Sequence, residues 1–516
     1  MAEFSSVNGG RELGGFNAQG LTTHPEYQNY IRRWEFLIRS YLGGIEYRFG
    51  NYLTKYVMES SGEYISRIAQ TPLDNHCKSV VHIFNSFLFR TEPDRDFGSM
   101  EGMPELESFL EDADLEGRTW DSFMKDVNIL SSVYGSVLCL VDKSDVNVGT
   151  RAEELEQGLR PYVSIYTPEN ILDWSFTRLP SGLYECSYVK LLEREMRADN
   201  VNVQFYVRTI TKDTITIESY EPNKKNALNV VEVKPNNIGK VPVVWVYAQR
   251  SPARGIGVSD IGDIADMQNG IYNELSEIEA TIRLSGHPSL VKTVDCQASA
   301  GAGAIINMPN DLDPGLRPSL LQPSGQSIDS ILNSVKSKIE AIDRMAFLGS
   351  MRAIETRAMS GVALQTEMLQ LDVKLNEKAR NLELAEEQIW RLFARWMNMT
   401  FDGEIKYPTQ FQVRDRNYEM DLLKKAADSN PADPRVKAAI DMKILDMLDL
   451  DEDEITALKN PNLLDINNVP EVEDEEEIKE EPKMMIDSVT GQQKTVSDPD
   501  ELRQLVKDGW VERDEG

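Results

Sequence analysis

The feature that most constrains this chain is a pair of amphipathic segments separated by 41 residues punctuated with glycine and proline. The first segment runs from Ser259 to Ser285 and the second from Ser327 to Leu348. In both, aliphatic residues recur every three or four positions, as on one face of an α-helix. At 1.5 Å per residue the two rods would be about 40 Å and about 33 Å long. Two rods of similar length around a compact insertion predict an antiparallel helical hairpin.

Each rod of this hairpin carries one narrow apolar stripe. A hairpin alone cannot bury such a stripe fully, so we expect neighbouring copies of the chain to cover it. The predicted interface residues are Ile261, Ile264, Ile271, Leu275, Ile278 and Ile282 in the first rod and Val335, Ile339 and Ile342 in the second.

The stretch GIGVSDIGDI, residues 255–264, leads into the first rod. It lacks the third glycine of a dinucleotide-binding loop, since Gly255 and Gly257 are followed by Asp260, whose charge would repel a pyrophosphate. The glycines instead permit a sharp turn, and Ser259 can cap the helix that follows. We expect Asp260 and the next two aspartates to form a solvated stripe favoured by the helix dipole rather than a magnesium site.

The rest of the chain divides by periodicity. From His24 to about Lys143 the pattern is helical, and between Arg160 and Gln249 it changes to short β-rich runs, which predict a mainly antiparallel region. A helix of about 40 residues begins near Ser360, and EIKYPTQFQV, residues 404–413, predicts a returning strand. Because sheet and helices occupy different stretches, the fold class is α+β.

The charge of the chain is uneven. Its formal net charge is −30, and residues 449–516 contribute 22 acidic and 7 basic side chains. Within them, the run EVEDEEEIKEEP has too few apolar residues to offset the conformational entropy that it would lose on folding. This predicts an acidic, largely disordered tail. Within that tail DPDELRQLVKDGW predicts a small docking helix.

The sequence also indicates which kinds of chemistry to expect. It contains no phosphate-binding loop, zinc-protease motif or nucleophile elbow. Four dispersed cysteines predict reduced packing residues, and His76 and His82 lack partners at metal-ligand spacing. No apolar run is long enough to span a membrane, and the N-terminus lacks a signal-peptide pattern. We therefore expect a soluble, non-enzymatic protein that needs no cofactor or metal.

The order of these segments resembles the portal proteins of tailed bacteriophages. The resemblance is carried by HPEYQNYIRRWEFLIRSYLGG near the start, by GIGVSDIGDIADMQNGIYNELSEIEATIRLSGHPSLV, and by MSGVALQTEMLQL at the start of the long helix. It extends over most of residues 24–450. The regions it implies are a flexible N-terminus (1–23), a helical and β wing (24–254), a first stem helix (255–286), a small α/β clip (287–326), a second stem helix (327–349), a tunnel loop (350–359), a long wing helix with its returning strand (360–418), a helical crown (419–460) and the tail (461–516).

The resemblance also implies a function. Portal proteins form a dodecameric ring at one capsid vertex, through which a terminase motor packages double-stranded DNA and through which DNA is ejected. The implied partners are further copies of the chain, the terminase large subunit, a head-tail adaptor, and the major capsid and scaffolding proteins. The implied location is the portal vertex of the virion, with assembly in the host cytoplasm. A minor capsid or adaptor subunit remains an alternative, and a nucleotide-using enzyme is a more distant one.

Two sets of site residues follow from this resemblance. A DNA conduit must not hold its cargo, so an acidic surface with a few basic positions suits it better than a continuous basic wall. The basic positions in the second stem helix and tunnel loop are Lys336, Lys338, Arg344, Arg352 and Arg357. The positions expected to dock the motor or adaptor at the tip of the clip are Gly301, Ala302, Gly303 and Ala304.

Overall fold

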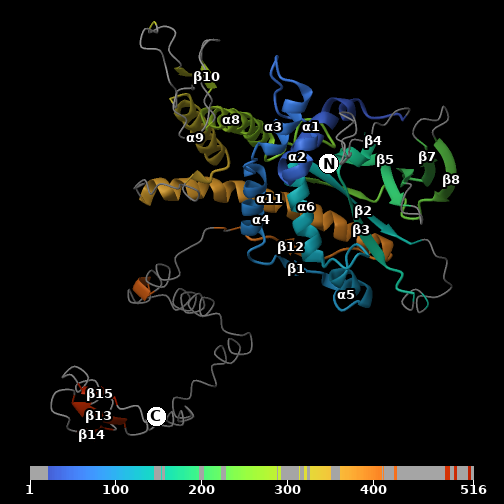
Figure 1. Cartoon of the computed structure of the whole chain (residues 1–516). Helices are drawn as coiled ribbons and strands as arrows, with labels where there is room; N and C mark the ends of the chain where they lie inside the picture. Colours follow the sequence, from blue (N-terminus) through green and yellow to red (C-terminus); the bar gives the residue numbers. More distant parts are fainter. Residues whose placement is uncertain are drawn as a thin grey trace. The chain divides into compact units, whose positions relative to one another are not determined.

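The chain is described here from a computed structural model (Figure 1). It consists of two units, Met1–Gln412 and Val413–Gly516. The structure describes residues 21–144, 153, 157–196, 203–221, 228–286, 289–291, 313, 319–321, 326–349, 361–409, 411, 424–426, 483–487, 493–496 and 510–512.

Helices dominate the first part of the larger unit, as the periodicity predicts. The α-helices are α1 (Pro25–Leu42), α2 (Gly44–Phe49), α3 (Ser61–Gln70), α4 (His76–Leu88), α5 (Pro104–Glu111) and α6 (Trp120–Tyr134). Local signals set several of their ends. Proline lies in the first turn of α1 and α5, and Ser60 and Glu63 form a capping box at α3.

The helical pattern was expected to continue to about Lys143, and this is wrong. Ser136–Lys143 is strand β2, and Asp94–Asp96 is the short strand β1. Gly135, at φ 91°, ends α6 in a conformation that favours glycine. The residues after it form a continuous apolar run that is buried on both faces, which suits a central strand.

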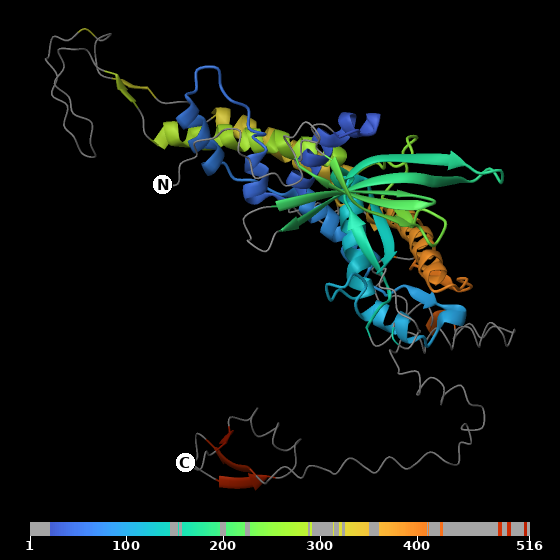
Figure 2. The same ribbon diagram turned by 90° about the vertical axis from the view of Figure 1, so that its right-hand side faces the viewer.

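Two antiparallel sheets follow, in agreement with the predicted β region. One has the order β3-β2-β9, with β3 at Pro161–Tyr166 and β9 at Val243–Tyr247. The other has the order β4-β5-β6-β7-β8, and its strands lie together in Figure 2. They are β4 (Ile171–Arg178), β5 (Tyr184–Met196), β6 (Val203–Thr211), β7 (Thr214–Tyr220) and β8 (Leu228–Pro235).

The predicted rods and long helix are present. The rods are α8 (Gly262–Gly286) and α9 (Gln326–Met345), and the long helix is α11 (Gly361–Trp396). Strands β10 (Ser289–Val291) and β11 (Ser319–Leu321) pair antiparallel between the two rods. After α11, β12 (Glu404–Lys406) pairs with β1, which confirms the first part of the predicted returning strand.

A cluster of aromatic rings lies in the core of the larger unit where α11 meets α5 and α6. Trp390 packs against Phe109 and Trp120, with ring centroids 5.3 Å and 4.9 Å away. The fully buried carboxylate of Glu386 accepts hydrogen bonds from both of these tryptophan indoles, from Arg95 at 2.6 Å and from the Tyr407 hydroxyl at 2.5 Å. Such a buried charge is tolerated because every partner donates to it.

The smaller unit contains strands in the region predicted to be a largely disordered tail. They are β13 (Lys483–Asp487), β14 (Gln493–Val496) and β15 (Trp510–Glu512), in the order β14-β13-β15. At these residues the structure has strands where the sequence predicted disorder, and the backbone register places Ile486 opposite Val511. The acidic run and most of the predicted crown lie outside the described residues.

Candidate functional site

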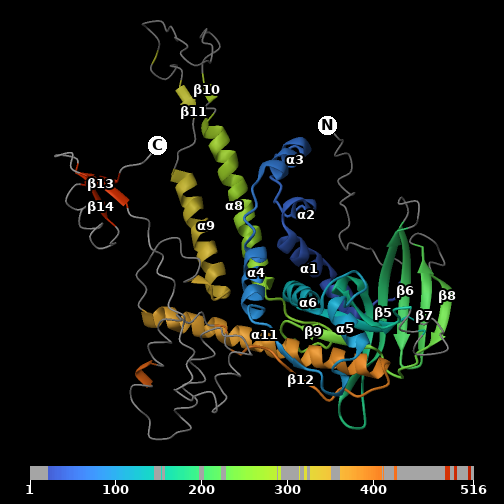
Figure 3. The same cartoon turned by 90° about the horizontal axis from the view of Figure 1, so that it is seen from below.

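The hairpin of α8 and α9 is the candidate site, because the predicted stem residues lie on it. The two helices run side by side in opposite directions (Figures 1 and 3). Glu274 of α8 accepts a hydrogen bond from Ser334 of α9 at 2.7 Å and forms an ion pair with Lys338. A side chain at Gly270 would meet Lys338 at 3.3 Å, so glycine allows the helices to approach closely there. These contacts confirm the antiparallel hairpin predicted from the sequence.

The apolar stripe of the hairpin is mostly buried within one chain. The buried members are Ile261, Ile264, Ile271, Ile278, Val335 and Ile342, whereas Leu275 and Ile339 are partly buried against the same core. Only Ile282, 48% exposed, lies open to solvent among the nine predicted positions. The premise that neighbouring copies must bury this stripe is therefore wrong, because α8 also packs on α1 and α4. Contacts between copies remain a prediction, and within the stripe Ile282 is the residue most available for them.

The turn before α8 fits tightly against the body of the larger unit. Gly255 has φ 85°, and a Cβ on Gly257 would lie 2.0 Å from the carbonyl oxygen of Gly135. The Ser259 hydroxyl accepts from the amide of Ile261 and donates to the carbonyl of Val133 at 2.6 Å. These glycines thus allow a close backbone contact that positions the helix, and Ser259 stabilises the turn just before α8 begins at Gly262.

Asp260 is buried and does not belong to the solvated stripe that was predicted for it. Its carboxylate is 1% exposed and lies 2.5 Å from the ammonium group of Lys378 and 3.1 Å from that of Lys374, both on α11. Burial alone would raise the pKa of Asp260, but the two lysines outweigh it and hold that pKa below its ordinary value. Lys378 also donates to the Ser132 hydroxyl at 2.8 Å. A buried ion cluster therefore fixes the base of α8 to α11 and α6.

Two further contacts hold α8 against the helical layer. Arg33 of α1 binds the carboxylate of Asp266 through two hydrogen bonds of 2.7 Å and 2.9 Å. The buried amide of Gln268 accepts from the backbone of Cys77 at 2.9 Å and donates to the carbonyl of Ser40 at 3.0 Å. Asp266 remains largely exposed and Asp263 is exposed, so the predicted solvated stripe is correct for these two aspartates. Together the contacts give α8 a defined direction relative to α1 and α4.

The predicted DNA-facing residues differ in their surroundings. Lys336 and Arg344 are exposed on α9, together with the acidic Asp329 and Glu340. Lys338 is engaged by Glu274, which reduces its availability to a phosphate. Arg352 and Arg357 lie outside the described residues, and so do Gly301, Ala302, Gly303 and Ala304. The roles assigned to these residues stay predictions.

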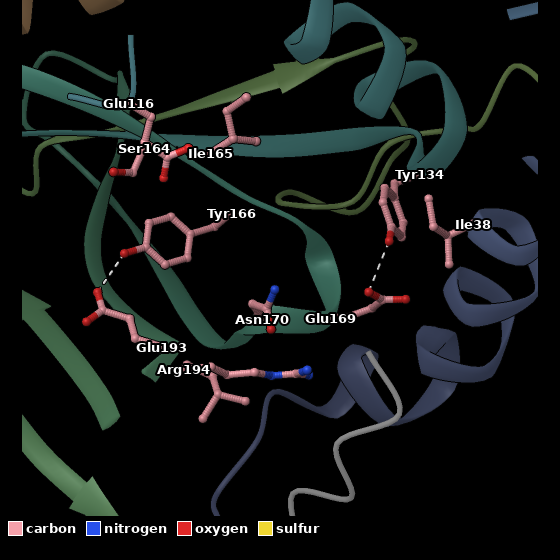
Figure 4. Close-up of a pocket in the computed structure, with 11 residues that line it drawn as sticks. Ile38, Glu116, Tyr134, Ser164, Ile165, Tyr166, Glu169, Asn170, Glu193 and Arg194 are labelled. Carbon is pink, nitrogen blue, oxygen red and sulfur yellow. Dashed lines mark hydrogen bonds between the residues drawn. The ribbon is translucent and has the colours of Figure 1, made fainter. Parts of the chain in front are cut away.

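A pocket lies in the body of the larger unit, away from the hairpin, and Figure 4 shows its lining. Glu169 is buried at its edge and accepts a hydrogen bond from the Tyr134 hydroxyl at 3.0 Å. Burial raises the pKa of Glu169 to about 7. The Tyr27 hydroxyl of α1 donates to the carbonyl oxygen of Glu169 at 3.0 Å, so this position joins α1 to the sheet region.

The raised pKa of Glu169 predicts a pH-dependent stability. A carboxyl group whose pKa rises from 4.5 to about 7 on folding stabilises the fold fully below 4.5, and that contribution is lost as the pH rises to about 7. We expect Glu169→Gln, which resembles the protonated acid, to be more stable than the wild type by about 3 kcal/mol at pH 8 and by little at pH 4. Denaturant unfolding at both pH values measures this difference. An equal effect at the two pH values would contradict the burial of a titrating carboxylate.

The described residues contain no group of histidines, cysteines or acidic side chains that could hold a metal ion. Within the same ranges, no helix is long and apolar enough to cross a membrane. The cysteines that the structure describes, Cys77, Cys139 and Cys186, are free thiols, and burial raises the pKa of each to about 12. These thiols are therefore poor nucleophiles at neutral pH.

Comparison with known proteins gives structural likenesses only. The sequence matches no protein-family model and no curated protein. A chain from the virion of a native gene transfer agent particle is similar over 70% of this chain and 89% of that chain, at 8% identity and a TM-score of 0.39. A chain from the neck of an empty gene transfer agent particle is similar over 75% of this chain and 94% of that chain, at 8% identity and a TM-score of 0.41.

Proposed function

We propose that this chain is the subunit of a portal ring, which forms the conduit for double-stranded DNA at one vertex of a phage-type capsid. The observation that supports the proposal most directly is the α8–α9 hairpin, anchored at its base by Asp260 and carrying the β10–β11 pair at its other end. These elements occur in the order that the sequence resemblance to portal proteins implies. The proposed role is structural, without bond chemistry of its own.

The charge on α9 suits a conduit. The exposed Lys336 and Arg344 alternate along the helix with the exposed Asp329 and Glu340, so the surface carries both signs. A continuous basic surface would displace many counterions from DNA and bind it tightly, whereas a mixed surface would guide the duplex and release it. We propose that this face of α9 lines the channel, with Arg352 and Arg357 in the loop that narrows it.

The proposed partners follow from the same role. They are further copies of the chain in a twelve-membered ring, the terminase large subunit and a head-tail adaptor at the clip, and the major capsid and scaffolding proteins around the wing. The proposed location is the portal vertex of the virion. A minor capsid or adaptor subunit is the second candidate, because a helical and β body of this kind would also serve a protein that binds to a ring.

Particle mass and shape test the proposal. Twelve copies of the 58.4 kDa chain would have a mass of about 700 kDa. We expect the purified protein to form such particles in mass photometry and to show rings with a central channel in averaged electron-microscope projections. A protein that remains monomeric at all concentrations, or that assembles only on a preformed ring, would favour the adaptor alternative. Thermal stabilisation by a nucleotide would instead favour the enzyme alternative.

A further inference from the structure

An exposed apolar turn connects α2 to α3. Val57 and Met58 at its tip are 98% and 93% exposed, although both are large hydrophobic residues. Isolated exposed apolar residues are common on protein surfaces, but two adjacent ones at nearly full exposure are suited to insertion into a partner. We call residues 56–59, with Val57 and Met58 at the tip, the apolar knob.

One buried arginine fixes the conformation of the knob. Arg67 of α3 binds both carboxylate oxygens of Glu59, each at 2.7 Å, and its guanidinium lies 4.0 Å from the centre of the Tyr56 ring. The same guanidinium donates to the carbonyl of Thr54 at 2.7 Å and to the hydroxyl of Ser276 on α8 at 3.0 Å. A surface that is already ordered loses little entropy on binding, so this knob is preorganised for a contact.

The knob is also fixed at a defined position along α8. The side chain of Asn273 on α8 accepts from the amide of Thr54 at 2.8 Å and donates to the carbonyl of Tyr52 at 3.2 Å. The next residue, Glu274, faces α9 and binds Ser334. Figures 1 and 3 both show α8 between α3 and α9. The knob and α9 therefore lie on opposite flanks of the stem at the same level.

The flank of α9 offers an apolar residue at this level. Leu332, two positions from Ser334, is 39% exposed, and Ile328 and Ile331 beside it are partly buried. Exposed charges of both signs border each of the two surfaces. Lys55 and Glu63, next to the knob, are exposed, and the α9 flank presents Asp329 and Lys336 around Leu332. Opposite charges at the rim of an apolar contact help to set its register.

We propose that the apolar knob of one copy packs against the Leu332 flank of α9 in the next copy. This inference rests on the proposed ring, because a closed head-to-tail ring requires two different surfaces that face opposite sides of each subunit at equal height. The knob and α9 are suited to this requirement, because they lie on opposite sides of α8 at the same level. The partner is thus a second copy of this chain rather than a terminase or an adaptor.

The first experiment replaces the two tip residues. We expect Val57→Asp with Met58→Asp to raise the concentration needed for half-maximal ring formation at least tenfold, because two charges would enter an apolar contact. The thermal melting curve of the monomer should not change, since both side chains are exposed. Leu183→Asp is the matched control, because Leu183 is 68% exposed on the turn between β4 and β5 and should leave assembly unaffected.

The second experiment asks which surface the knob contacts. With Met58→Cys and Leu332→Cys in one chain, mild oxidation should produce a ladder of covalent oligomers on a non-reducing gel. Each variant with only one of the two introduced cysteines, and the pair Leu183→Cys with Leu332→Cys, should produce none. The native Cys77 and Cys139 are buried and should not contribute, and the two other native cysteines, Cys186 and Cys296, are replaced by serine in every variant.

The outcomes separate this inference from the proposed function. Absence of rings in the wild type would contradict the ring itself. Wild-type rings together with normal assembly of the knob variant would overturn only the role of the knob. Rings that depend on the knob but give no ladder would overturn the assignment of Leu332 as its partner.

Discussion

Ile271→Asp is expected to destabilise the folded chain itself, with a loss of about 4 kcal/mol or more in the free energy of unfolding. Ile271 is 1% exposed in the main core, so the new carboxylate would have to enter an apolar site without a partner. Since domains are commonly stable by about 5–15 kcal/mol, most of that margin would be lost. We expect low soluble yield and a strongly lowered melting temperature in the monomer.

Ile282→Asp is the matched control for this prediction. It makes the same chemical change on the same stripe of α8, but Ile282 is 48% exposed. Its effect on the free energy of unfolding should stay within about 0.5 kcal/mol, as for most surface substitutions. If Ile271→Asp instead melted like the wild type and only dissociated rings, the burial of the stripe within one chain would be wrong.

Asp260→Ala should lower the free energy of unfolding by about 3–5 kcal/mol. The substitution leaves Lys378, 2% exposed, with a buried charge and no carboxylate, and it removes a partner of Lys374. Because these groups join the base of α8 to α11, we also expect weaker ring assembly. Denaturant unfolding and particle mass measure the two effects.

The pH dependence of the Asp260 variant provides a specific check. The folded pKa of Asp260 is depressed, so its ion pairs stabilise the wild type above the ordinary value of 3.8 and lose that effect as the pH falls through the folded pKa. The difference between wild type and Asp260→Ala should therefore shrink below that value. Asp263→Ala, which removes an exposed carboxylate in the first turn of α8, should have little effect at any pH. A similar loss in both variants would indicate a general helix-dipole effect instead of the buried cluster.

Periodicity alone predicted the two helices of the α8–α9 hairpin and the long helix α11. The spacing of isoleucines indicated α8 and α9 within a few residues of their ends. In α11, Leu371, Leu375 and Phe393 have the spacing of one helix face and are buried. This succeeds because one-sided burial leaves a repeated local trace in the sequence. The same approach failed at Ser136–Lys143, where burial on both faces of a strand removes the alternation that would distinguish it from a helix.

Partners that are distant in the chain could not be predicted in this way. Asp260 resembles its neighbours Asp263 and Asp266 in sequence, yet it alone is buried against two lysines, and Lys378 is 118 residues away. Glu386 likewise has the helical spacing of a surface glutamate but binds Arg95 and two indoles in the core. A charge pattern indicates which groups are available for pairing, whereas the packing of helices decides which of them meet.

The sequence by itself thus determined the kinds and order of the elements: a helical layer, an antiparallel region, two matched rods and a long helix. These depend on local spacing, which any one segment carries. Only the tertiary structure decided that Ile271 is buried while Ile282 is exposed, that Asp260 anchors the α8–α9 hairpin, and that Val57 and Met58 project from a turn fixed by Arg67. The physical reason is that burial and ion pairing depend on what the rest of the chain places nearby, and no local pattern records that placement.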